Sequence, residues 1–182
     1  KNPFPTMPLK FWNDKNDKKF KEAYFNQFKN TWHHGDFAEI KKTKGFIIHG
    51  RSDTTLNPGG VRLGTAEIYS EVEKFKEIKE SIVVGQSWDN DVRIVLFIVM
   101  NEKFILSKDL LKKIKLQIRK NASPRHVPSK VIVVRDIPRT KSGKIVELAV
   151  KNTIEGNNIK NKEALANPKA LEQFKNLKEL NI

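Results

Sequence analysis

Residues 82–100 read IVVGQSWDNDVRIVLFIVM, and this stretch decides the fold. Two apolar, β-branched runs, residues 82–85 and 93–100, flank the polar turn formers at residues 87–91. This pattern predicts two strands, each buried on at least one face, that pair antiparallel. The longest unbroken apolar run, residues 94–100, is far shorter than the about 20 residues that cross a bilayer, so we expect no membrane segment.

Helical patterns and a third strand surround this strand pair. Residues 66–75 follow a candidate N-cap, Thr65, and residues 107–120 begin at a serine cap and have one apolar face. Residues 131–134 are apolar and β-branched. The order strand, strand, helix, strand predicts an α+β domain at about residues 54–155, with a small, three-stranded, mostly antiparallel sheet flanked by helices.

The two ends of the chain have other patterns. Aromatic residues four positions apart predict a helix within residues 17–29. Strand-like pieces at residues 31–34, 37–41 and 45–51 predict a β-rich segment with a hairpin. The tail becomes Asn- and Lys-rich and is expected to carry one short helix at residues 169–177.

Composition narrows the possible chemistry. The 182 residues hold 35 Lys and Arg against 21 Asp and Glu, a net charge of +14, and no cysteine. The absence of cysteine excludes disulfides, thiolate nucleophiles and Cys-ligated metals. Of the four histidines, His33 and His34 would point to opposite faces of a strand, and His49 and His126 stand in unrelated contexts, so no metal site is expected. The charge leaves a small nucleic-acid-binding domain as an alternative, although the lysines are scattered over every segment.

Two segments could bind phosphate. Residues 138–144, PRTKSGK, bring three cations and a glycine between a strand and a helix, but they lack the first glycine of a Walker-type loop. Arg51 and Arg62 could grip a phosphate on either side of Asp53, although a structural ion pair explains Arg51 and Asp53 equally well. Asp36 follows a glycine and could reach a ribose diol.

Taken in order, four motifs resemble the late motifs of the adenylate-forming acyl-CoA synthetases: HGD at residues 34–36, GRSD at 50–53, GVRLGTAEI at 60–68 and PRTKSGK at 138–144. Within that superfamily the chain is most similar to the acetoacetyl-CoA synthetase family. That likeness rests on four further segments: PFPTMPLKFWND at 3–14, SPRHVP at 123–128, KIVELAVK at 144–151 and EALANP at 163–168.

The resemblance implies a role for each matched position. Lys144 would be the catalytic residue of adenylation, and Asp53 would be the hinge between a large N-terminal domain and a mobile C-terminal domain. ATP or AMP would be bound by Asp36, Arg51 and Arg62. CoA would be bound by Gly59, Gly60, Val61, Arg62 and, by a looser match, Lys115.

The resemblance also implies how the chain is organised and what it works with. Residues 1–52 would end the N-terminal adenylation domain, residue 53 would be the hinge, residues 54–155 the mobile domain and residues 156–182 a tail. Since the chain would be only the last quarter to third of such an enzyme, we expect it to be inactive alone. Its substrates would be acetoacetate, ATP and CoA, with acetyl- or propionyl-CoA synthetase as an alternative. Mg²⁺ would serve the full-length enzyme without binding this segment, and the location would be cytoplasmic.

Overall fold

The computed structural model describes residues 4–159 and 161–182. Contacts between residues divide the chain into two compact units, Lys1–Gly35 and Asp36–Ile182, and each is described by itself. Pro3 of the PFPTMPLKFWND segment lies outside the described residues. Within the described ranges, no helix has both the length and the apolar character that a membrane span needs.

The described residues of the first unit contain one short α-helix. Helix α1 (Lys18–Tyr24) follows the 3₁₀ turn η1 (Lys15–Asp17) and is shorter than the helix predicted within residues 17–29. The Asp14 carboxylate accepts the main-chain N–H of Lys19 at 2.8 Å, which satisfies a donor at the start of the helix.

The predicted strand at residues 31–34 is wrong. The ring of Trp32 stacks on that of Tyr24 with 3.8 Å between centroids, and these residues are irregular. The aromatic contact with α1 therefore outweighs the local strand preference of this stretch.

The second unit begins with the predicted hairpin. Strand β1 (Asp36–Ile40) pairs antiparallel with β2 (Phe46–Arg51), and Asp36 lies opposite Arg51. A short bridge joins Leu56 to Leu63 around the 3₁₀ turn η2 (Pro58–Gly60).

The central sheet has the order β3-β4-β5. Strand β3 (Ile78–Trp88) pairs antiparallel with β4 (Asp91–Met100), which confirms the pairing predicted from residues 82–100. Strand β5 (Lys130–Val133) pairs parallel with β4. The sheet therefore has one antiparallel pairing, β3–β4, and one parallel pairing, β4–β5. Helix α3 (Lys108–Asn121) lies in the connection between β4 and β5. A crossover connection of this kind allows two consecutive strands to run parallel.

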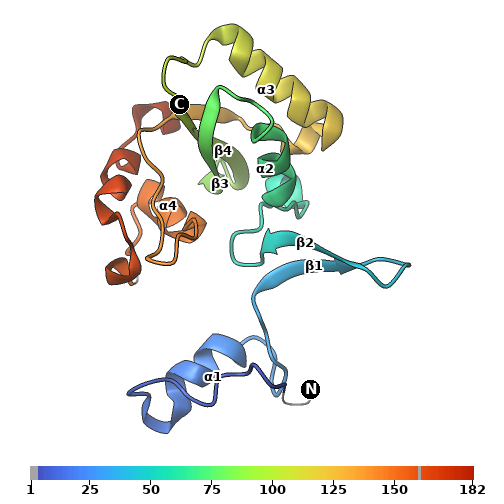
Figure 1. The fold of residues 1–182 in the computed structure, drawn as a ribbon, viewed down its shortest axis with the longest axis vertical. Helices are drawn as coiled ribbons and strands as arrows, with labels where there is room; N and C mark the ends of the chain where they lie inside the picture. Colours follow the sequence, from blue (N-terminus) through green and yellow to red (C-terminus); the bar gives the residue numbers. More distant parts are fainter. Residues whose placement is uncertain (1–3, 160) are drawn as a thin grey trace. The chain divides into compact units, whose positions relative to one another are not determined.

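Both faces of this sheet are buried. Leu96 of β4 faces a cluster formed with helix α2 (Ala66–Val72) and α3, whereas its neighbour Phe97 faces helix α4 (Glu147–Ile154) and the C-terminal turns. Figure 1 shows α2 and α3 on one side of β3 and β4, with α4 and the red C-terminal segment on the other. Burial on both faces explains why β4 is a continuous apolar run without alternation.

Of the two predicted helix caps, the structure contains one. Ser107 caps α3, because its Oγ accepts the N–H of Leu110 at 3.1 Å. The Thr65 cap is wrong, since Thr65 has helical backbone angles and makes no side-chain cap bond.

Short 3₁₀ turns complete the chain. The predicted helix at residues 169–177 is a 3₁₀ segment, η5 (Pro168–Phe174). The other turns are η3 (Pro124–His126), η4 (Lys162–Ala164) and η6 (Lys178–Leu180).

Candidate functional site

The PRTKSGK segment is a closed loop between β5 and α4. Arg139 bridges to Ile145, and the N–H of Gly143 donates to the carbonyl of Thr140 at 2.8 Å. Gly143 has φ +83°, a left-handed conformation that side chains with a Cβ rarely adopt. The glycine is therefore needed for the loop to close directly before Lys144.

Lys144 combines a fixed backbone with an exposed side chain. Its N–H donates to Thr140 Oγ1 at 3.0 Å, and its carbonyl accepts the N–H of Thr140 at 2.9 Å. The residue as a whole is exposed. An ammonium group on a flexible stem can thus be presented from a rigid anchor.

The C-terminal segment clamps this loop. Lys141 donates its N–H to the carbonyl of Ala164 at 3.0 Å, and Ala166 donates to the carbonyl of Arg139 at 2.8 Å. The Asn167 side chain accepts the N–H of Arg139 at 2.8 Å and donates to the carbonyl of Ile137 at 2.9 Å. The EALANP motif of the tail is therefore part of the loop's support.

Asp36, Arg51 and Asp53 lie together at the end of the hairpin. Arg51 Nη1 lies 3.4 Å from Asp36 Oδ1, and its Nε lies 3.4 Å from Asp53 Oδ1. All three side chains are at least one-third exposed. The structure thus brings Arg51 together with Asp36, which lies 15 positions before it in the sequence, and with Asp53, which lies 2 positions after it.

The glycine turn is held from the neighbouring sheet. The N–H of Gly59 donates to both carboxylate oxygens of Asp91, each at 2.9 Å. Gly60 has φ +76° and open space where a Cβ would stand, and Val61 and Arg62 that follow are exposed. An anion or a narrow chain could approach this turn closely.

Lys115 lies on α3 and is partly buried, unlike the exposed Lys112 and Lys113 of the same helix. The structure thus places Lys144, Arg62 and Lys115 on three separate elements.

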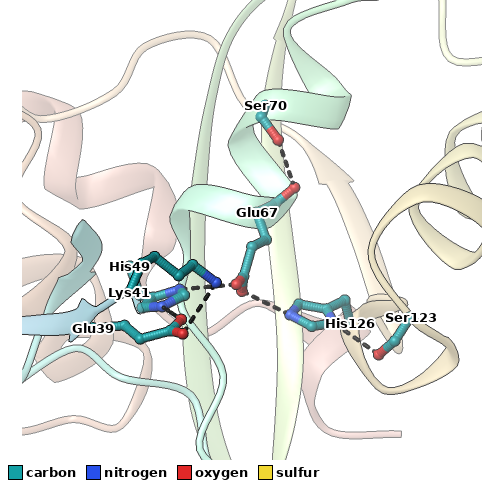
Figure 2. Close-up of polar contacts among 7 residues, drawn as sticks. All are labelled: Glu39, Lys41, His49, Glu67, Ser70, Ser123 and His126. Atoms are coloured by element: carbon teal, nitrogen blue, oxygen red, sulfur yellow. Dashed lines mark hydrogen bonds and ion pairs between the residues drawn. The ribbon is translucent and has the colours of Figure 1, made fainter. Parts of the chain in front are cut away.

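Glu67 is the centre of a polar cluster that sequence reasoning missed. His49 Nδ1 lies 2.9 Å from Glu67 Oε1, and His126 Nε2 lies 2.9 Å from Glu67 Oε2. The carboxylate of Glu67 thus lies between two imidazole rings (Figure 2). His49 also meets Glu39 at 3.2 Å, and His126 meets Ser123 at 2.8 Å.

The expectation that His49 and His126 stand in unrelated contexts is therefore wrong. They come from β2 and η3, and only the position of α2 brings them to one carboxylate. Among the described residues, no three His, Asp or Glu side chains are arranged to hold a metal ion. The one available signal was Glu67 itself, a carboxylate within the GVRLGTAEI motif.

Tyr69 connects the same helix to α4. Its hydroxyl donates to Glu147 Oε1 at 2.5 Å and accepts the N–H of Val83 at 3.0 Å. Burial, with the charge of Glu147, raises the pKa of Tyr69, so its hydroxyl stays a donor. Through Glu147, three residues after Lys144, α2 supports the segment that follows the loop.

Comparison with known proteins finds one family model and several proteins that are similar to this chain. The family model of the AMP-binding enzyme C-terminal domain matches residues 67–144. Acetoacetyl-coenzyme A synthetase of Rhizobium meliloti (strain 1021) is 58% identical over 177 residues, which are 97% of this chain and 27% of that protein. Acetoacetyl-CoA synthetase of Xenopus tropicalis is 48% identical over 98% of this chain and 27% of its own length.

A solved structure is also similar to this chain. Acetoacetyl-CoA synthetase from Streptomyces lividans superposes with a TM-score of 0.89 at 38% identity, covering 100% of this chain and 28% of that one. The chain thus spans about a quarter of the length of the curated relatives that it matches.

Proposed function

Because residues 67–144 match the family model of the AMP-binding enzyme C-terminal domain, we propose that this chain is the C-terminal part of an acid–thiol ligase. The ligase adenylates acetoacetate with ATP, releasing pyrophosphate, and then transfers the acyl group to CoA, releasing AMP. Similarity over nearly the whole chain to acetoacetyl-CoA synthetases supports this substrate over acetate or propionate.

The observation that carries the proposal is the exposed Lys144 side chain on a loop whose backbone is closed by hydrogen bonds. In the adenylation step this ammonium lies between the carboxylate of the acid and the α-phosphate, where negative charge builds. A cation delivered at that point lowers the barrier by electrostatic stabilisation.

The hairpin end is the second contact with the nucleotide. Asp36 accepts the ribose hydroxyls, and Arg51, already oriented by Asp36 and Asp53, contributes a ribose or phosphate contact. Arg62 meets phosphate from the exposed end of the glycine turn.

The glycine turn serves the second half-reaction. Gly59, Gly60 and Val61 line the path of the pantetheine arm, since Gly60 leaves open space beside the backbone. Lys115 attracts the phosphates of the CoA nucleotide. Mg²⁺ that accompanies ATP is proposed to bind elsewhere in the full-length enzyme, because residues 138–144 offer cations and hydroxyls and no carboxylate.

The proposal includes a missing N-terminal domain and a hinge at Asp53. Apolar residues of the hairpin support it: Ile40 and Phe46 are 69% and 70% exposed, which suits contact with a preceding domain. The division at residues 52 and 54 and the cytoplasmic location stay predictions.

Pyrophosphate exchange in the full-length enzyme tests the function. We expect exchange that depends on acetoacetate, at least tenfold faster than with acetate or propionate, and no activity from the 182-residue chain alone. Exchange driven equally by acetate would contradict the substrate. Tight binding of DNA that persists at about 0.5 M salt, well above the physiological ionic strength of about 0.15 M, would favour the nucleic-acid alternative.

A further inference from the structure

The Arg139 side chain makes two contacts, one within the Lys144 loop and one with the central sheet. Its Nη1 donates to the carbonyl of Gly143 at 2.9 Å, and its Nη2 donates to Glu80 Oε2 on β3 at 2.9 Å. The Arg139 and Glu80 side chains are 33% and 27% exposed, so the pair is partly shielded from solvent. One guanidinium thus connects the sheet to the peptide that precedes Lys144.

The backbone of Arg139 is itself fixed. The tail holds its N–H through Asn167 at 2.8 Å and its carbonyl through Ala166 at 2.8 Å. The arginine is therefore a rigid support, and a guanidinium fork can hold two acceptors at once.

The contact with Gly143 matters because of peptide geometry. The carbonyl of Gly143 and the N–H of Lys144 belong to one planar unit, so holding the oxygen fixes the orientation of that whole peptide. Gly143 itself resists rotation little, because it lacks a Cβ and has open space around it.

We propose that Arg139 is a positioning residue for Lys144, and that Glu80 in turn orients Arg139. This inference rests on the proposed role of Lys144 in adenylation. It predicts that loss of the Arg139 contact slows adenylation, because the ammonium then starts from a mobile peptide, and leaves thioester formation unchanged.

Half-reaction assays on the full-length enzyme test the catalytic part. Arg139→Ala is expected to lower kcat for acetoacetate-dependent adenylation by about 10- to 100-fold, with KM for ATP nearly unchanged, as small misplacements of reacting groups do. Thioester formation from supplied acyl-adenylate should stay within about twofold. Arg135→Ala, an exposed arginine on the same segment, is the matched control and should lower neither step.

A charge reversal separates positioning from simple ion pairing. Glu80→Arg combined with Arg139→Glu keeps an ion pair, but a glutamate at position 139 cannot donate to the carbonyl of Gly143. We expect this double variant to remain as slow in adenylation as Arg139→Ala. Recovery of adenylation would overturn the proposal, and so would equal losses in both half-reactions.

Hydrogen exchange on the 182-residue chain gives a readout that does not need ligase activity. Arg139→Ala should speed exchange of the Gly143 and Lys144 amides by about fivefold or more, while α3 amides keep their rates. Unchanged exchange would overturn the positioning role whatever the activity shows. If the parent enzyme lacks acetoacetate-dependent adenylation while exchange responds as expected, the proposed function fails and the support of the loop by Arg139 stands.

Discussion

The ring of Phe97 in β4 meets the ring of Phe174 in η5 edge to face, with 4.9 Å between centroids and 78° between planes. Both side chains are fully buried. The tail that carries Phe174 also supplies Ala164 and Ala166, which hydrogen-bond to the Lys144 loop. The tail is therefore part of the core of this unit and a support of its candidate site.

Removing this ring should destabilise the protein strongly. Phe174→Ala is expected to lower the free energy of unfolding by about 3–5 kcal/mol, the usual cost of emptying a packed aromatic site. Urea denaturation measures the change. Ile182→Ala, an exposed residue of the same tail, should cost less than about 0.5 kcal/mol. Similar losses in both variants would contradict the central place of Phe174.

Lys144→Ala in the full-length enzyme should lower the adenylation rate by about 10²-fold or more, because one charge-stabilising group is lost. Thioester formation from supplied acyl-adenylate should be largely spared. Lys141→Ala is the control, since Lys141 contributes its main-chain N–H to the tail and its exposed charge should be worth less than about tenfold. Equal losses in the two variants, measured by pyrophosphate exchange, would count against Lys144.

Gly60→Leu should block the thiol of CoA while leaving pyrophosphate exchange nearly intact. The position has φ +76° and open space around it, so a large side chain would fill the path beside the turn. Gly60→Asn is the matched variant, because asparagine tolerates this backbone conformation better than most residues. Loss of both half-reactions in Gly60→Leu would indicate a folding role for the turn.

Gly64 is needed for close packing of the hairpin. A Cβ atom on Gly64 would lie 2.3 Å from the carbonyl oxygen of His49 and 2.7 Å from its Cβ, and neither backbone can yield easily. Gly64→Ala should therefore cost about 1–3 kcal/mol of stability, as overpacking does. Gly45→Ala, where the nearest atom is 3.7 Å away, should be nearly neutral. Calorimetric melting temperatures that fall equally in both would refute this.

Glu71 should make stability depend on acid pH. Hydrogen bonds from Lys74 first, and then from Asn121 and Gln117, lower the pKa of this carboxyl against the opposing effect of burial. Because the folded pKa lies below the unfolded one, the stabilisation is present above the unfolded pKa and is lost as pH falls through the folded pKa.

Glu71→Gln should flatten this loss between about pH 5 and pH 3 and lower stability at pH 7. Urea midpoints at both ends of that range measure the effect. A variant whose stability falls with acid as steeply as the parent's would show that other carboxyls carry the dependence.

Local patterns determined much of this protein. The β3–β4 pair, the β1–β2 hairpin and the Ser107 cap each form within one continuous stretch of the chain, so the sequence predicted them correctly. The motif order also located the candidate site residues along the chain. Pattern alone misjudged the Thr65 cap, because Thr65 has helical backbone angles, and residues 31–34, where Trp32 stacks on Tyr24 of α1.

Tertiary structure alone decided what surrounds those residues. His49 and His126 meet at Glu67, and Arg139 reaches Glu80, across separations of 18, 59 and 59 positions. Such contacts depend on how helices pack on the two faces of the sheet, and local propensity carries no information about that packing. The sequence therefore named Lys144, whereas only the packed tail and the Arg139 guanidinium show what holds its loop in place.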